Sequence, residues 1–207
     1  MKEFYQKEWE KAKDIYKLPF LIVFILTLAI AAGGYIFLIS NPPIVHAAME
    51  QLGAQFENMG AGPDAEHSTL FWVIVLNNLQ VSFFVIILGF IPVLFLPALS
   101  PVITGLSVSV VLAFTQAAGE NPLSVFALGI LPHGIIEMIG LFLCSAAGIY
   151  ISLSIAKKIF SPNRDSIELT LRIGQAFKTY FGVVVPLIII AALIEGFVTP
   201  HFLDMME

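Results

Sequence analysis

The chain has 207 residues, of which 58% are hydrophobic and only 12% are charged. A soluble domain usually carries about 25% charged residues, so this composition excludes an ordinary globular protein and indicates an integral membrane protein. The formal net charge of −5 gives no reason to expect nucleic-acid binding. The single cysteine, Cys144, excludes an intrachain disulfide.

Residues 1–17 are predicted to form a cytoplasmic helix on the membrane surface. Apolar and aromatic residues recur there at helical spacing between lysines and glutamates, as in interfacial helices: Tyr5, Trp9, Ala12 and Tyr16. Residues 18–207 are predicted to form a single transmembrane domain, whose first span is expected over residues 18–39. Because this apolar run follows about 17 polar residues and is long enough to cross a bilayer, it is not expected to be a cleavable signal peptide.

An external loop over residues 40–68 is predicted to follow the first span. It contains a short apolar stripe, which favours packing at the membrane surface: Met49, Leu52, Phe56 and Met59. The second span is expected over residues 69–91 and the third over residues 102–116, with a proline-rich turn between them. Residues 119–122, with the sequence Gly-Glu-Asn-Pro, predict a short external turn.

The apolar run from Leu123 to Ala156 is too long for one crossing and too short for two. About 20 residues cross a bilayer once, and this run has about 34 and ends at Lys157. We therefore expect a short re-entrant or broken helix that ends at Pro132-His133-Gly134, followed by a full span. Irregular backbone at membrane depth requires protein or water around it, so Pro132 and Gly134 are expected in the protein interior.

The basic residues predict the orientation of the spans. All ten Lys and Arg residues lie either before the first span or within residues 157–179, which are predicted to be a cytoplasmic loop by the positive-inside rule. Asp165 and Glu168 have capping-box spacing before a helix expected over residues 169–177. A fifth span over residues 180–198 then leaves the C-terminus outside. The predicted fold is an all-α polytopic helix bundle of the inner membrane, with five spans and one broken helix.

Five polar residues inside the apolar segments are the candidate functional residues: Asn77, Asn78, His133, Glu137 and Glu195. A charged side chain near the bilayer centre costs roughly 2.5–3.5 kcal/mol on insertion scales, so such a residue needs a partner, a wet cavity or a function. His133 and Glu137 are four residues apart and project from one face of a helix. We expect the five residues to form one buried polar cluster from three separated parts of the chain.

The helix face of His133 and Glu137 continues into small residues. These residues follow at intervals of three or four and form one stripe: Gly140, Cys144 and Gly148. Small residues allow helices to approach closely. The candidate counterparts lie in the third and fifth spans: Gly105, Ser109 and Ala191. The stripe serves either packing within one chain or a homodimer.

The polar cluster has a structural and several functional interpretations. In the structural one, its residues form interhelical hydrogen bonds, each of which contributes only about 0.6 kcal/mol on average. In the functional ones, the cluster is a proton or ion site of a transporter, a metal site or an intramembrane catalytic site. The candidate metal ligands are His133, Glu137 and Glu195, whose types suit zinc. No catalytic motif is recognised, so the sequence predicts no catalytic residue and no cofactor.

Three segments give the chain a resemblance to a known family. They are Leu131-Pro132-His133-Gly134-Ile135-Ile136-Glu137, Asn77-Asn78-Leu79-Gln80-Val81-Ser82 and Ile194-Glu195-Gly196-Phe197-Val198-Thr199-Pro200. Together they resemble the stage II sporulation protein M family, and the resemblance extends from the first span to the C-terminus. In sporulating bacteria it implies a membrane anchor or scaffold in a complex with peptidoglycan-degrading partners. Similar proteins of non-sporulating prokaryotes, including archaea, have no assigned role.

The interpretation that we favour from the sequence is a membrane scaffold or partner-binding subunit that is not an enzyme. The alternative is a small transporter or channel in which His133, Glu137 and Glu195 form an ion or proton site. The lipid bilayer is the predicted environment. A second copy of the chain and a protein of a membrane complex are the candidate partners.

Overall fold

The structure, a computed structural model, describes residues 2–62, 65–160 and 168–204, and these residues form helices and turns but no β-strand. Five helical stretches are long and apolar enough to cross a membrane, which confirms the predicted all-α polytopic class with five spans. The stretches are Asp14–Ile39, His67–Leu88, Leu96–Ala117, Pro122–Phe160 and Leu169–His201.

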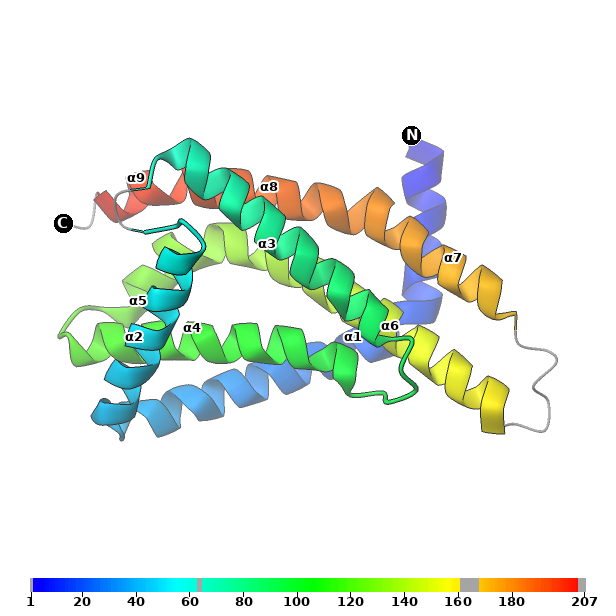
Figure 1. Cartoon of the computed structure of the whole chain (residues 1–207), viewed down its shortest axis with the longest axis horizontal. Coiled ribbons are helices and arrows are strands. Elements are labelled where there is room, and N and C mark those ends of the chain that lie inside the picture. Colours follow the sequence, from blue (N-terminus) through cyan, green and yellow to red (C-terminus); the bar gives the residue numbers. More distant parts are fainter. Residues whose placement is uncertain (1, 63–64, 161–167, 205–207) are drawn as a thin grey trace.

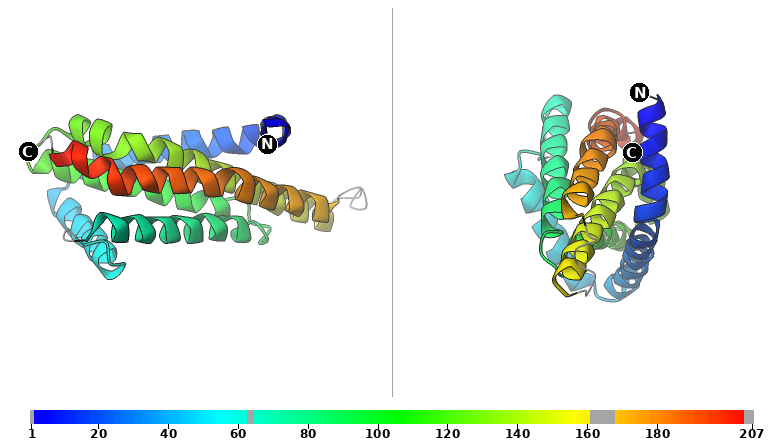
Figure 2. Two further views of the ribbon diagram at one scale, coloured as in Figure 1. Left: turned by 90° about the horizontal axis from the view of Figure 1, so that it is seen from above. Right: turned by 90° about the vertical axis from the view of Figure 1, so that its right-hand side faces the viewer.

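Helix α1 (Lys2–Ile39) contains the first span and has Pro19 inside it. Proline removes a helical hydrogen bond and clashes with the preceding turn, so it bends a helix. Figures 1 and 2 show the N-terminal part of α1 running across one end of the bundle, while its later part runs along the bundle. The N-terminal helix predicted over residues 1–17 is therefore continuous with the first span.

Small residues bring α1 and α4 (Leu99–Ala117) together along their lengths. A Cβ atom on Gly105 would lie only 2.9 Å from Thr27 Cγ2, so the glycine is needed for this approach. The Ser109 hydroxyl lies 2.8 Å from the Ala31 carbonyl oxygen and 2.9 Å from that of Gly105. Gly105 and Ser109 thus pack against α1, which corrects the predicted pairing of these two residues with the stripe on the fourth span.

The fourth span stays helical from α5 (Pro122–Ser124) through the π-helical segment η2 (Val125–Ile130) into α6 (Leu131–Phe160). This corrects the predicted break at Pro132–Gly134: the irregular segment is a wide turn that ends two residues before Pro132. In an α-helix the proline ring would clash with the carbonyl group four residues earlier. That carbonyl group belongs to Leu128, inside the π-helical segment, where the wider turn gives the ring room.

The fifth span has the same construction. Helix α7 (Leu169–Thr179) leads through the π-helical segment η4 (Tyr180–Val184) into α8 (Val185–Phe197), which has Pro186 in its first turn. The short α9 (Thr199–Asp204) follows. The helix expected over residues 169–177 is thus present and continuous with the span. Of its predicted capping box, Asp165 lies outside the described residues, and the Glu168 side chain makes no capping hydrogen bond.

Helix α6 lies at the centre of the bundle and contacts α1, α3 (His67–Leu88), α7 and α8. Its stripe of small residues faces these helices. Gly140 lies against Val184 and Ile188 of the fifth span, and Cys144 has no exposed surface. A second copy of the chain therefore cannot pack on this stripe, and the Cys144 thiol is not accessible for the cross-link that a homodimer seam would allow.

The connection between α3 and α4, residues 89–98, is held on α6 by close packing and two hydroxyl groups. A Cβ atom on Gly89 would overlap the Gly148 carbonyl group. On either side of Gly148, Ser145 donates a hydrogen bond of 2.7 Å to the Pro97 carbonyl oxygen, and Ser152 donates one of 2.9 Å to that of Ile91. Two carbonyl groups of this connection are therefore satisfied within the protein.

The two ends of the bundle differ in their charged residues and in the helices that cover them. At one end, called the lysine end here, α6 finishes with Lys157 and Lys158 in its last turn. At the other end, α2 (Pro42–Asn58) lies across the bundle in Figure 1. It packs on α1 and α4 through a small apolar core of Leu38, Val45 and Ala113. The predicted external loop over residues 40–68 is thus mostly helical.

The close approach at Gly148 predicts that a single methyl group there is destabilising. In Gly148→Ala the new Cβ would lie 2.9 Å from Pro97 Cβ and from the Val85 carbonyl oxygen. We expect the free energy of unfolding in mild detergent to fall by about 1–3 kcal/mol, the usual cost of overpacking. The control is Gly174→Ala, since no atom lies within 4 Å of its new Cβ; it should leave stability unchanged or raise it by up to about 1 kcal/mol. Equal effects of the two changes would contradict this packing.

Candidate functional site

A cavity of about 1890 Å³ lies between α1, α3, α4 and α6 and is bordered by α2 at one end. Most of its lining side chains are apolar, and some of them are widely exposed, such as Phe84 of α3 (59%) and Ile103 of α4 (60%). The cavity is therefore an open groove rather than a closed chamber, and it is called the α3–α4 groove below. All five candidate functional residues line it: Asn77, Asn78, His133, Glu137 and Glu195.

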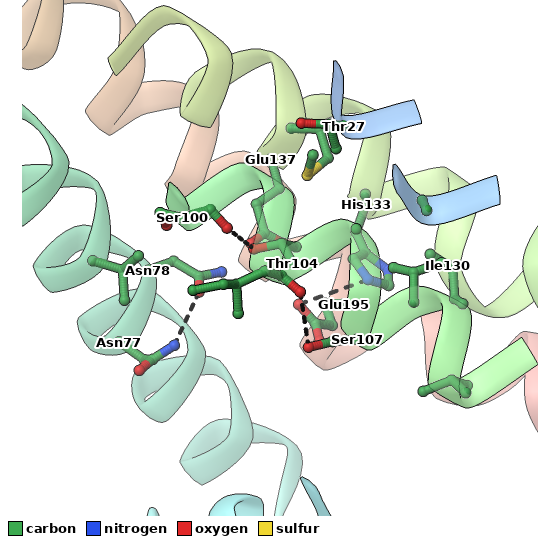
Figure 3. Close-up of a pocket in the computed structure, with 18 of the residues that line it drawn as sticks. Thr27, Asn77, Asn78, Ser100, Thr104, Ser107, Ile130, His133, Glu137 and Glu195 are labelled. Carbon is green, nitrogen blue, oxygen red and sulfur yellow. Dashed lines mark hydrogen bonds and ion pairs between the residues drawn. The ribbon is translucent and has the colours of Figure 1, made fainter. Parts of the chain in front are cut away.

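His133 joins α6 to the end of the fifth span. Its Nε2 atom lies 3.9 Å from Glu195 Oε2, a distance at which a protonated imidazole and a carboxylate form an ion pair (Figure 3). Its Nδ1 atom lies 3.3 Å from the Thr199 hydroxyl, so both ring nitrogens have a partner. The side chains of His133 and Glu195 are 12% and 27% exposed, so the pair is partly shielded from the groove.

Glu137 lies one turn after His133 on α6 and also lines the groove. It is close enough to Glu195 for the two carboxyl groups to interact electrostatically. Within the part of the chain that the structure describes, no hydrogen bond or ion pair reaches the Glu137 carboxyl group. The groove thus contains one carboxyl group with a protein partner and one without.

The asparagines of α3 form a second polar group on the opposite wall. Asn77 Nδ2 donates a hydrogen bond of 3.2 Å to Asn78 Oδ1. Thr104 of α4 lines the same groove, but its hydroxyl donates to the Ser100 carbonyl oxygen of its own helix, at 3.2 Å. Among the polar residues that line the groove, the side-chain contacts between separate helices are therefore those of His133 with Glu195 and Thr199.

The groove offers little support for a metal site. In residues 2–62, 65–160 and 168–204, no three His, Cys, Asp or Glu side chains come together as a set that could hold a metal ion. His133 and Glu195 approach each other, but Glu137 does not complete a ligand set with them. The three candidate ligands that the sequence offered therefore do not form such a set in the described structure.

Three parts of the site were indicated only weakly by the sequence or not at all. The apolar stripe formed by α2 and its C-cap residue Met59 lines the groove: Met49, Leu52, Phe56 and Met59. Thr199 orients His133, and in the sequence it stands out only as part of the segment 194–200 that resembles the family. His67, at the start of α3, donates a hydrogen bond of 3.0 Å from its Nδ1 atom to the Gly196 carbonyl oxygen. These contacts join elements far apart in the chain.

A further polar contact at the lysine end fixes α7 in place. Arg172 donates a hydrogen bond of 2.9 Å to the Ser154 hydroxyl of α6, and its guanidinium group lies 4.9 Å from the centre of the Tyr150 ring. Tyr150 in turn meets the ring of Tyr16 edge-on, with 5.9 Å between ring centres. This arrangement ties α1, α6 and α7 together outside the groove, and we interpret it as structural.

Comparison with known proteins identifies one family. A family model described as Stage II sporulation protein M matches residues 20–200, a range that includes every residue of the polar site. No curated protein and no solved structure matches the chain.

The contact of His133 with Glu195 predicts a measurable coupling. In a double-mutant cycle of His133→Ala and Glu195→Ala, we expect a coupling energy of about 0.6 kcal/mol in the free energy of unfolding, the average for interhelical polar contacts in membrane proteins, and at most about 1.7 kcal/mol. The control cycle combines His133→Ala with Glu50→Ala, because Glu50 is an exposed residue of α2, and should give a value near zero. A coupling near zero for the first pair would show that the contact contributes nothing.

Proposed function

The chain belongs to the Stage II sporulation protein M family, and we propose that it acts as a membrane scaffold or partner-binding subunit without an enzymatic activity. The observation on which the proposal rests is the α3–α4 groove. Polar side chains of membrane spans usually face the interior of a bundle or a water-filled cavity. Here Glu137 and Asn78 line a groove whose walls include exposed side chains. A bundle built in this way is completed by another membrane component.

The lysines support a proposed orientation in the membrane. Lys157 and Lys158 lie in the last turn of α6, and Lys178 lies in the last turn of α7. By the positive-inside rule, we propose that the lysine end faces the cytoplasm and that α2 and α9 lie on the outer side of the inner membrane. The groove then has α2 at its outer end. Since the small-residue stripe of α6 is buried, a homo-oligomer has to use another face of the bundle.

The scaffold proposal predicts a stable complex in native membranes. Extraction of the tagged chain from its own cells in mild detergent should yield a species larger than any homo-oligomer, with a second membrane protein at fixed stoichiometry. Native mass spectrometry of the extracted complex measures both. The matched variants are Ile103→Trp, which fills the groove, and Leu76→Trp, at a similarly exposed position of α3 that does not line it. Recovery of this chain alone would contradict the proposal.

The second candidate function is a small transporter or channel for protons or cations. The specific observation in its favour is the set of titratable groups around the groove: the His133–Glu195 pair and the nearby Glu137 carboxyl group. Intramembrane carboxylates at irregular helices are common in ion pathways. The π-helical segment before α6 is such an irregularity.

This alternative predicts an ion flux that depends on Glu137. Purified protein in proteoliposomes would conduct protons or a monovalent cation under an imposed gradient, and Glu137→Gln would reduce the flux at least about tenfold, because the carboxylate that binds the ion is lost. Ser107→Ala, at a polar groove position outside the five candidate residues, serves as the control for general disturbance of the bundle. A wild-type flux no greater than that of empty liposomes would exclude the alternative and leave the scaffold proposal in place.

A further inference from the structure

We propose that the α3–α4 groove binds one transmembrane helix of a partner protein, and that this helix presents a basic side chain to Glu137. The inference rests on the proposed scaffold function and adds the kind of partner and the contact that selects it.

The size of the groove fits a helix. An α-helix with side chains is about 10 Å wide, so its cross-section is about 80 Å². The groove volume of about 1890 Å³ therefore corresponds to about 24 Å of helix, or roughly 16 residues. The hydrocarbon core of a bilayer is about 30 Å thick. The groove thus accommodates most of one membrane-spanning helix.

The walls of the groove suit a helical partner. Apolar side chains extend into it from different helices, among them Phe84 of α3, Ile103 of α4 and Ile135 of α6. At the α2 end, Met49 and Met59 are part of the lining. Methionine side chains adapt their shape to irregular surfaces, which suits an interface with a separate chain.

The charges in the groove favour a partner helix over a lipid molecule as its occupant. Its lining includes two carboxyl groups and, within the described residues, no Lys or Arg. His133 already contacts Glu195 and Thr199, so Glu137 is the group that lacks a donor. An acyl chain has no donor to offer, and a lipid phosphate would be repelled by the two carboxyl groups. A helix with a Lys or Arg side chain at the depth of Glu137 satisfies it.

The same comparison disfavours a second copy of this chain as the occupant. Among the described residues, its basic side chains lie at the lysine end, in α7 and near the start of the first span: Lys17, Lys157, Lys158, Arg172 and Lys178. None of these lies near the middle of a span. A second copy therefore cannot place a positive charge at the depth of Glu137, whereas a different protein can.

The experiment uses the full chain in liposomes and synthetic transmembrane peptides as probes. Three Leu/Ala peptides of about 22 residues carry a central Lys, a central Leu, or a Lys moved two turns toward one end. A photo-cross-linking residue replaces Ile103, which lines the groove and is 60% exposed, or Leu76, which does not line it and is 63% exposed. The yield of the protein–peptide cross-link is measured for each combination.

We expect the central-Lys peptide to cross-link at position 103 about fivefold to tenfold more than the other two peptides, and no such preference at position 76. Glu137→Gln should reduce the preference while thermal unfolding shows an intact bundle. Equal yields from the three peptides, or equal yields at the two positions, would overturn the proposal. So would a cross-linked dimer of this chain through position 103, since it would identify a second copy as the occupant.

The two proposals fail in different ways. If the peptides show no preference but the native complex survives in Ile103→Trp, the proposal that the groove binds a helix is wrong and the scaffold function stands. If native membranes yield no complex at all, the scaffold function itself is wrong, whatever the peptides do.

Discussion

The close contact between Gly148 of α6 and the backbone around Gly89 determines the shape of this protein. It allows the connection between α3 and α4 to lie directly on the central helix, where Ser145 and Ser152 bind its carbonyl groups. α3 and α4 therefore meet at the lysine end and diverge toward α2 (Figure 1). The α3–α4 groove is a consequence of this one point of attachment, because no comparable contact draws the other ends of the two helices together in the described structure.

The same geometry determines which polar side chains of the groove are paired within the protein. In a bundle closed along its whole length, His133, Glu137, Glu195 and the asparagines would satisfy one another, and a purely structural interpretation would suffice. Here His133 bridges to the fifth span, while Glu137 and Asn78 line the α3–α4 groove, and no hydrogen bond or ion pair reaches the Glu137 carboxyl group within the described residues. Both candidate functions follow from this incomplete pairing. A scaffold satisfies Glu137 with a partner's side chain, and a transporter satisfies it with a mobile ion.

Hydropathy and charge were sufficient to predict the five spans, because each requires only a long apolar run and a polar boundary. Periodicity also predicted the face shared by His133, Glu137 and the small-residue stripe. It did not predict which helix lies opposite that face, since spacing along one helix contains no information about its neighbour. Gly105 and Ser109 therefore packed on α1 instead of α6, and the α2 stripe lined a groove instead of only the membrane surface. The expected break at Pro132 was replaced by a wider turn before it.

Wide turns of this kind also explain why Glu195 lies in the site. From Ala176 to Glu195 the chain advances by 19 residues, which in a regular α-helix amounts to about 1,900° and leaves Glu195 about 100° away from the face of Ala176. The π-helical segment Tyr180–Val184 takes up one additional residue, which is equivalent to about 100°. Buried Ala176, Tyr180, Val184 and Ile188 are thereby kept on the same side as Glu195, facing α6. The irregularity before Pro186 therefore directs this carboxyl group toward His133 and away from lipid.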